Sequence, residues 1–158
     1  RDYFRHMAAG SRPGICIIED VDGDSARGAW WGEVHSYVHR DVCGLAGAVT
    51  NGLMRDLGDL APGFPVLAGG AGPSHGFVHV RSIGQPVNVF GMTVYEGDLI
   101  HADRHGALVI PPTVMRVLEA AIDKLLATEK LVLEPANAAG FNFEKFEAAW
   151  QAFEKART

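Results

Sequence analysis

The sequence predicts an α/β fold with mixed sheets and C-terminal helices. Three observations lead to this prediction: short apolar runs alternate with glycine-rich turns, a strand, helix, strand order occupies residues 15–50, and two amphipathic helical patterns follow residue 111. The chain has 158 residues, which is about the length of one ordinary domain. We therefore expect a single domain over residues 1–158.

The predicted strands are short apolar segments bounded by turn residues. Residues 77–81 and 86–90 alternate between apolar and polar side chains, as half-buried strands do, whereas residues 15–18 are continuously apolar, as a strand covered on both faces would be. These segments indicate a central sheet. The predicted strands are 15–20, 45–50, 64–68, 77–81, 86–90, 92–96, 99–103 and 107–111.

Helical periodicity marks three further segments. Residues 30–41 carry apolar side chains at helical spacing after the first strand, and a second stripe begins at Pro112, a residue favoured at helix starts. The third segment, residues 141–158, is predicted to be an amphipathic C-terminal helix. Its aromatic residues recur at three-to-four spacing: Phe143, Phe146, Trp150 and Phe153. This stripe is compatible both with packing on its own domain and with an oligomer contact.

Composition excludes several classes of function. The chain has 14 Lys and Arg against 19 Asp and Glu, a formal net charge of −5, and no basic run that could neutralise a row of phosphates, so we expect no nucleic-acid partner. No stretch approaches the roughly 20 apolar residues that cross a bilayer, so we expect no membrane partner. Cys16 and Cys43 are too few for a disulfide framework. We expect both cysteines in the core and the protein in the cytoplasm.

Residues 48–60 give the strongest indication of function. An apolar strand runs into Asn51-Gly52, a turn pair that tolerates positive φ, and Arg55 and Asp56 follow. Strand ends of this kind are where α/β proteins collect ligands. The guanidinium of Arg55 suits a carboxylate, and the carboxylate of Asp56 suits Mg²⁺ or Mn²⁺. An ordinary ion pair is the competing interpretation.

A second half-site is predicted upstream. Gly32 and Glu33 lie near the start of the first predicted helix, where free N–H groups and the helix dipole favour an anion. If the strand, helix, strand prediction holds, this helix start and the Asn51-Gly52 turn lie near the same sheet edge. Four charged side chains would then lie together: Glu33, Arg55, Asp56 and Asp59.

Histidines recur four residues apart in three pairs: His35 and His39, His75 and His79, His101 and His105. Only the first pair falls in a predicted helix, and no zinc-protease motif accompanies it, so hydrogen-bonded structural histidines are favoured over a zinc site. His75 lies in the glycine-rich loop 68–76, and its role stays open. That loop lacks the lysine and the following helix of a phosphate-binding loop, so nucleotide binding is not favoured.

Taken together, the motifs of the chain resemble the RraA-like family, which includes the 4-hydroxy-4-methyl-2-oxoglutarate aldolases and the regulators of ribonuclease activity A. The resemblance extends over about residues 13–125. Its motifs are WGE at 31–33, GLAGAVTNG at 44–52, RD at 55–56, FPV at 64–66, EGD at 96–98, AD at 102–103 and GALVIP at 106–111.

The resemblance implies a β/β/α fold like the phosphohistidine swivelling domain, assembled as homotrimers or hexamers with active sites between subunits. It also implies a metal-dependent, class II pyruvate aldolase. On this basis Arg55 grips the pyruvoyl carboxylate, Asp56 binds Mg²⁺ or Mn²⁺, and Glu33 and Asp59 are further catalytic residues. The substrate would be held by Arg55 together with a segment of four residues: Gly32, Glu33, Val34 and His35.

The expected reaction is cleavage of a 4-hydroxy-2-oxo acid to pyruvate. Bond scission leaves the enolate of pyruvate, and a chelated dication stabilises its charge. Decarboxylation of oxaloacetate passes through the same enolate, so one site could catalyse both reactions. The alternative is a non-catalytic RraA-like protein that binds and regulates a ribonuclease. Because family members carry helices ahead of this region, we expect the chain to lack an N-terminal helical segment.

Overall fold

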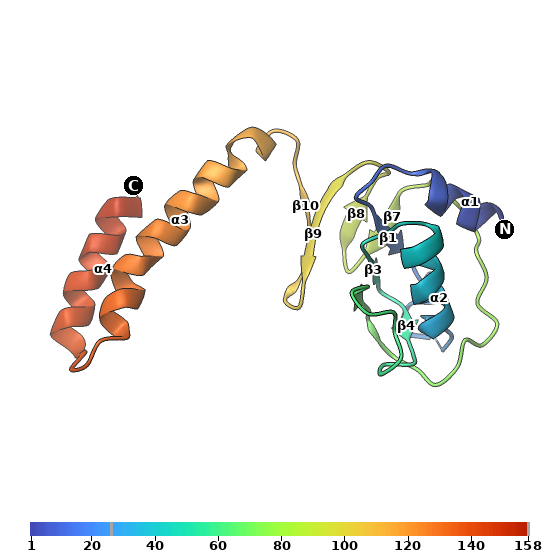
Figure 1. Ribbon diagram of the computed structural model, residues 1–158, viewed down its shortest axis with the longest axis horizontal. Coiled ribbons are helices and arrows are strands. Elements are labelled where there is room, and N and C mark those ends of the chain that lie inside the picture. The colour runs from blue at the N-terminus through green and yellow to red at the C-terminus, as the bar shows by residue number, and fades with distance from the viewer. Residues whose placement is uncertain (26, 158) are drawn as a thin grey trace. The chain divides into compact units, whose positions relative to one another are not determined.

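The computed structural model describes residues 1–25 and 27–157, which form two compact units, Arg1–Ile110 (unit 1) and Pro111–Thr158 (unit 2). Figure 1 shows the strands in unit 1 and the two long helices in unit 2. The single domain over residues 1–158 stays a prediction.

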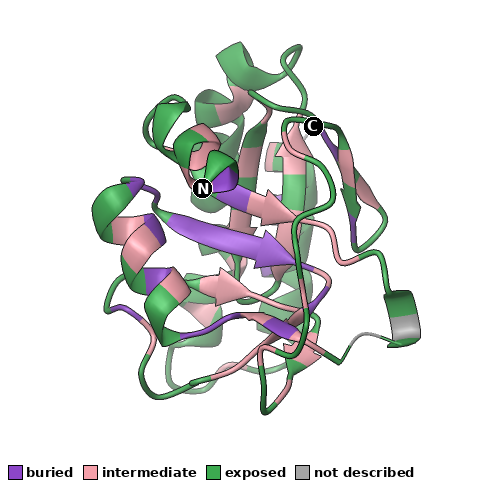
Figure 2. Ribbon diagram, turned by 90° about the vertical axis from the view of Figure 1, so that its right-hand side faces the viewer, coloured by how far each residue is buried: buried purple, intermediate pink, exposed green. Residues whose placement is uncertain are grey.

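A parallel three-stranded sheet forms the centre of unit 1. It has the order β1 (Ile15–Ile18), β3 (Gly47–Thr50), β5 (Val66–Leu67), with Ile15 opposite Gly47. All four residues of the middle strand β3 are buried, which is visible as a purple arrow in Figure 2. Its first three residues are apolar because both faces of the strand are covered, and the hydroxyl of the buried Thr50 accepts the N–H of Gly52 (3.0 Å).

A second parallel sheet has the order β2 (Ala29–Trp31), β4 (Leu53–Met54), β6 (Gly70–Ala71). Strands that follow one another in the chain lie in alternate sheets, from β1 to β2 and so on to β6. The turn at Asn51-Gly52 connects β3 to β4, and Arg55 is the first residue after β4. This crossing between sheets positions the candidate site.

The helix predicted over residues 30–41 begins later than expected. Trp30 and Trp31 belong to β2, and the helix starts with α2 (Glu33–Tyr37) and continues as the π-helical turn η2 (Val38–Val42). Trp31 is fully buried in the core, and Gly32 is extended, with φ −168° and ψ −170°, so the helix cannot include either residue. Tertiary burial of the indole therefore overrides the helical periodicity.

Two antiparallel hairpins complete the sheets of unit 1. They are β7 (Val87–Val89) with β8 (Met92–Val94), and β9 (Leu99–Asp103) with β10 (Gly106–Ile110). The α/β class is as predicted, but the described sheets are each wholly parallel or wholly antiparallel, so no single sheet is mixed. The predicted strand 77–81 is also wrong: these residues pair with no strand, although their side chains alternate.

The N-terminal helix α1 (Asp2–Ala9) packs on the first sheet through Tyr3, and the short turn η1 (Gly23–Ser25) follows β1. Cys16 and Cys43 are buried and not disulfide-bonded, as expected of core residues. The fully buried His39 donates from Nδ1 to the carbonyl of His35 (2.6 Å) and accepts at Nε2 from the hydroxyl of Tyr3 (2.7 Å). This neutral imidazole ties α1 to the helix that carries Glu33.

Unit 2 is a helical hairpin of α3 (Met115–Ala136) and α4 (Phe143–Arg157). The buried residues between the helices include Thr128, Ala149 and Phe153. Both helices confirm the periodicity of the sequence, and residue 158 of the predicted C-terminal helix lies outside the described residues. No helix within the described ranges is long and apolar enough to cross a membrane.

Candidate carboxylate and metal site

Arg55 follows β4 and is held against β2. Its backbone N–H donates to the carbonyl of Trp31 (2.8 Å), and its Nη1 donates to the carbonyl of Ala29 (2.5 Å). The side chain is 19% exposed. The guanidinium is therefore fixed along the strand while one part of it remains open to a ligand.

Asp56 occupies a left-handed backbone conformation, with φ +55°. Its carbonyl accepts a hydrogen bond from the N–H of Asp59 (2.9 Å), which closes a turn over residues 56–59. Residues other than glycine are uncommon in this conformation, which costs of the order of 1–3 kcal/mol and persists only where neighbouring contacts enforce it. Aspartate tolerates it better than most residues do.

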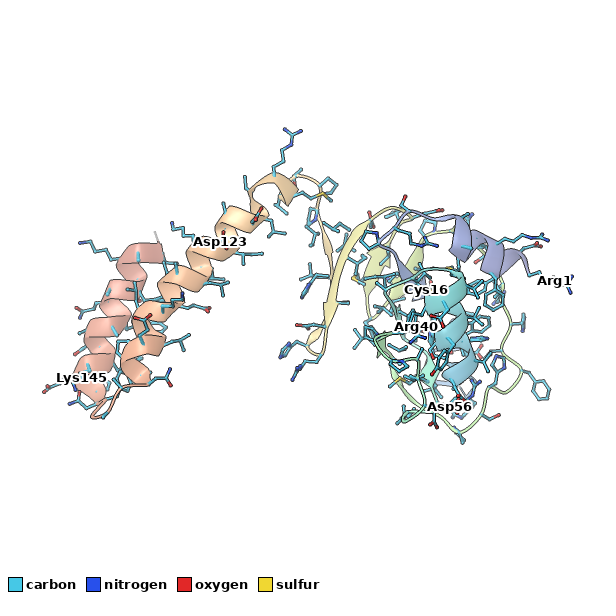
Figure 3. All side chains as sticks on the ribbon, in the orientation of Figure 1. Arg1, Cys16, Arg40, Asp56, Asp123 and Lys145 are labelled. Atoms are coloured by element: carbon cyan, nitrogen blue, oxygen red, sulfur yellow. The ribbon has the colours of Figure 1, made fainter. Side chains whose placement is uncertain are left out.

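The carboxylate of Asp56 joins the two predicted half-sites. Its Oδ2 accepts the backbone N–H of Glu33 (3.0 Å) and lies 3.4 Å from Nε of Arg55. Asp56, which is labelled in Figure 3, therefore caps the N-terminus of α2 from a distant segment. Within the described part of the chain Oδ1 has no hydrogen-bond partner, so this oxygen is available to a ligand.

Gly32 provides the space that this arrangement needs. A Cβ atom at residue 32 would lie 2.5 Å from Oδ2 of Asp56 and 2.8 Å from Cζ of Arg55. Because the φ of Gly32 is extended, any residue could adopt its backbone. Glycine is required here for the close approach of two side chains and not for conformational freedom.

The start of α2 presents further backbone donors beside Arg55. The N–H of Glu33 is taken by Asp56, and the first N–H bonded within the helix is that of Ser36, which donates to the carbonyl of Gly32 (3.0 Å). The N–H groups of Val34 and His35 lie between them, in the first turn, where a helix has no partners of its own for its donors. The predicted backbone half-site is therefore next to the predicted side-chain half-site.

The side chains of Glu33 and Asp59 are less engaged than the prediction implied. Both residues are exposed, and neither carboxylate makes a hydrogen bond or an ion pair with a described residue. The structure thus brings together Arg55, Asp56 and the backbone of Gly32 and Glu33. Asp59 joins this group only through its backbone N–H.

His35 turns its ring away from solvent. Its ring centroid lies 4.7 Å from that of Trp30 and 5.7 Å from that of His75, on the glycine-rich loop. Burial, followed by the proximity of His39, His75 and Arg55, lowers the pKa of His35 to about 4. His35 is therefore a neutral imidazole that packs the side of the site.

The sequence analysis missed Ser36, which is fully buried on α2. Its hydroxyl donates to the carbonyl of Glu33 (2.7 Å) and accepts the N–H of Ala61 (2.8 Å), the residue that lies just beyond the turn of Asp56 and Asp59. A single serine inside a helical pattern carries no signal of such a contact, because the contact depends on the path of a distant loop.

The remaining histidines have local partners. His101 Nε2 and His105 Nδ1 lie 3.8 and 3.1 Å from Oδ2 of Asp103, around the turn of the β9–β10 hairpin. Among the described residues, no group of three or more His, Cys, Asp or Glu side chains is arranged to hold a metal ion. A closed metal cage made of protein ligands alone is therefore not formed there.

The carboxylate of Asp56 instead suits an open site for a hard divalent cation, in which the protein supplies only a few of the ligands. Mg²⁺ is commonly held by only one or two carboxylates, with substrate oxygens and water completing its shell. Oδ1 of Asp56 offers one such carboxylate oxygen beside a guanidinium that would place a substrate. A cavity of about 970 Å³ is lined by β1 and residues 76–87 among others, and its lining includes neither Arg55 nor Asp56.

Comparisons with known proteins identify the family of the chain. A family model described as RraA-like, Aldolase/RraA, matches residues 3–109. A search of curated protein sequences gives no match. Three solved structures illustrate the structural similarity. An uncharacterized protein from Pseudomonas syringae pv. tomato superposes with a TM-score of 0.67 at 19% identity, covering 92% of this chain and 68% of that protein.

The other two structures are described as RraA proteins. RraAS2 of Streptomyces coelicolor, an unusual member of the RNase ES inhibitor RraA family, has a TM-score of 0.59 at 24% identity and covers 73% of this chain and 59% of its own. The RNA-processing inhibitor RraA from Thermus thermophilis has a TM-score of 0.58 at 25% identity, with coverages of 73% and 70%. The first similarity covers far more of this chain than unit 1 contains, so it extends into the helical hairpin.

Proposed function

The chain belongs to the RraA-like family, which includes metal-dependent aldolases and ribonuclease inhibitors, and on this premise we propose that it is a divalent-metal-dependent lyase that cleaves a 4-hydroxy-2-oxo acid to pyruvate. The observation that carries the proposal is the contact of Arg55 and Asp56 with each other and with the start of α2. The guanidinium of Arg55, which can bind a carboxylate, and the carboxylate of Asp56, which can bind a metal ion, therefore lie next to each other.

Arg55 is assigned to the carboxylate of the 2-oxo acid. Its bond to the carbonyl of Ala29 fixes the guanidinium before any ligand arrives, so little side-chain freedom is lost on binding. The N–H groups of Val34 and His35 would add donors to the same carboxylate, next to the positive end of the helix dipole. Neutral His35 packs against Trp30 beside these groups.

Asp56 is assigned to the cation, Mg²⁺ or Mn²⁺, through Oδ1. When bound, the cation would supply Lewis-acid stabilisation of the negative charge that develops on the 2-oxo oxygen. Oδ2 of Asp56 accepts the N–H of Glu33, and this bond fixes the orientation of the carboxylate.

Glu33 and Asp59 are assigned to proton transfer because both residues are exposed and lie close to Asp56 in the structure, Glu33 through its bond to Oδ2 and Asp59 through its bond to the carbonyl of Asp56. One of them would accept the proton of the C4 hydroxyl as the C3–C4 bond breaks, so that the C4 fragment leaves as a carbonyl compound and the electron pair of the broken bond forms the enolate. The resulting enolate would then take a proton at C3 and leave as pyruvate. Loss of CO₂ from oxaloacetate gives the same enolate, so we propose oxaloacetate decarboxylation as a second reaction of this site.

The experiment is a pyruvate-release assay coupled to lactate dehydrogenase, with a panel of 4-hydroxy-2-oxo acids and oxaloacetate in the presence of Mg²⁺. We expect pyruvate with wild-type protein, none after chelation, and none with Arg55→Ala. Arg40→Ala is the matched control, because Arg40 also pairs with the next aspartate in the chain, but its guanidinium bonds to the carbonyl of Pro62 and not to β2. Failure of every acid in the panel would overturn the proposal.

The second candidate is a protein that regulates a ribonuclease by binding, which the names of the two RraA structures favour. In that case an Arg55→Ala variant would bind a ribonuclease with unchanged affinity. A homotrimer or hexamer is proposed for either function. The exposed aromatic side chains of α4, such as Phe143 at 72% exposure, support an association surface.

A further inference from the structure

Ser36 lies between the two halves of the candidate site without facing the ligand. One half is the start of α2, and the other is the segment from Asp56 to Ala61. The serine hydroxyl bonds to both, to the carbonyl of Glu33 (2.7 Å) and to the N–H of Ala61 (2.8 Å), and it is fully buried. We propose that Ser36 is a positioning residue that holds the carboxylate of Asp56 in its metal-binding orientation.

The segment from Asp56 to Ala61 is fixed at both ends. At its near end, Oδ2 of Asp56 accepts the N–H of Glu33 (3.0 Å). In its middle, the carbonyl of Asp56 accepts the N–H of Asp59 (2.9 Å). At its far end, Ala61 is buried and its N–H is satisfied by Ser36. Both ends are therefore attached to the first turn of α2, at residues 33 and 36.

The backbone of Asp56 explains why the far attachment matters. Its φ of +55° is a conformation that relaxes once its surroundings no longer enforce it. Without the hydroxyl of Ser36, the N–H of Ala61 and one acceptor site on α2 lose their partner in a buried region, and the segment has to shift to satisfy them. The shift would release Asp56 from the left-handed conformation and from Glu33.

Arg55 is attached differently. Its N–H bonds to Trp31 and its Nη1 bonds to Ala29, both on β2. Neither bond passes through the segment that Ser36 holds. Loss of the serine hydroxyl should therefore weaken cation binding through Asp56 while leaving carboxylate binding through Arg55 nearly unchanged. A general loss of folding would weaken both.

The inference rests on the proposed function, and its test is read by binding as well as by activity. Calorimetric titration with Mg²⁺ and, separately, with pyruvate would be compared for wild type, Ser36→Ala and Thr128→Val. Thr128 is the matched control because its buried hydroxyl also donates to the carbonyl three residues earlier, that of Leu125 (2.8 Å), but lies in unit 2. For Ser36→Ala we expect about 10- to 100-fold weaker Mg²⁺ binding, the usual loss for a residue supporting a metal ligand. Pyruvate affinity should change less than about threefold.

A double-mutant cycle shows whether Ser36 acts through Asp56. In an Asp56→Asn background, Ser36→Ala should have little further effect on Mg²⁺ binding, because the ligand it supports is already lost. Full additivity, or an equal loss of Mg²⁺ and pyruvate affinity in Ser36→Ala alone, would overturn the inference. If Ser36→Ala yields no folded protein, Ser36→Cys replaces it, because the thiol keeps a weak donor and acceptor. We expect Ser36→Cys to weaken Mg²⁺ binding by less than about tenfold and to leave pyruvate binding nearly unchanged. Equal weakening of Mg²⁺ and pyruvate binding would contradict the inference.

The failure of the lyase proposal can be distinguished from the failure of this inference. If wild-type protein binds neither Mg²⁺ nor pyruvate, the proposed function fails. Hydrogen exchange of the Glu33 amide still tests the position of Asp56, because that N–H is protected by the carboxylate. Faster exchange in Ser36→Ala but not in Thr128→Val supports the role of Ser36, and unchanged exchange contradicts it.

Discussion

The backbone N–H of Glu33 donates a 3.0 Å hydrogen bond to Oδ2 of Asp56, 23 residues further along the chain. This bond caps a helix with a residue from another segment, and it leaves Oδ1 of the same carboxylate for a ligand. One contact therefore both stabilises the start of α2 and orients the candidate metal ligand.

Replacing Arg55 by lysine should weaken the binding of 2-oxo acids. An ammonium group carries the same charge but cannot form two parallel bonds to a carboxylate while a third nitrogen stays on the carbonyl of Ala29. We expect pyruvate affinity to fall about tenfold, or about 1.4 kcal/mol, as measured by calorimetry. Arg40→Lys should bind pyruvate as wild type does, and an equal loss in both variants would refute the assignment.

Asp56→Asn should mainly reduce the affinity for Mg²⁺. The amide oxygen can still accept the N–H of Glu33, and asparagine tolerates the left-handed backbone, so the free energy of unfolding should change by less than about 0.5 kcal/mol. The lost negative charge should weaken Mg²⁺ binding at least about tenfold. Titration with Mg²⁺ and urea unfolding check both halves of the prediction, with Asp41→Asn as the surface control.

Gly32→Ala should damage both functions of the site with little effect on the backbone. The new methyl group would meet Asp56 at 2.5 Å and Arg55 at 2.8 Å, so both side chains must move. We expect weaker binding of Mg²⁺ and of pyruvate. Gly58→Ala is the matched control, because a Cβ there has no atom within 4 Å. If Gly32→Ala binds Mg²⁺ and pyruvate as wild type does, the side chains of Arg55 and Asp56 do not need the space beside residue 32, and the prediction is wrong.

Acidification should destabilise the packing beside the site. The pKa of His35 is lowered from 6.5 to about 4 in the folded protein, first by burial and then by His39, His75 and Arg55. The unfolded chain therefore binds more protons than the folded chain between pH 6.5 and pH 4, so stability decreases as the pH falls through this range. Because the ring of His35 is partly exposed, we expect it to contribute about 1–2 kcal/mol to the decrease.

Urea unfolding at pH 7 and pH 4.5 measures this contribution. The difference between the two pH values should be smaller for His35→Gln, which does not titrate, than for wild type. A residual difference is expected, because burial also lowers the pKa of His39. The exposed His79 provides the control: His79→Gln should retain the wild-type pH dependence. Identical pH dependence in wild type and His35→Gln would contradict the prediction.

Much of the fold could be predicted from local patterns, and the misses have physical causes. The hairpin of β9 and β10 and the helices of unit 2 have strong periodicity and clear turns, so their positions were predicted within a few residues. The strand at Trp30 and Trp31 was predicted as helix, because the burial of Trp31 is decided by the core that surrounds it and not by its neighbours in sequence. Residues 77–81 alternate like a strand but have no strand beside them to pair with.

The chemical groups at the site follow from the sequence: a guanidinium next to a carboxylate after a strand, and a glycine before a helix. Which of their atoms meet depends on the tertiary structure. The bond between Glu33 and Asp56 and the buried bond between Ser36 and Ala61 join segments more than twenty residues apart. Contacts of that kind depend on the path of the chain between the two sheets. The pattern of residues in one stretch of sequence does not indicate that path.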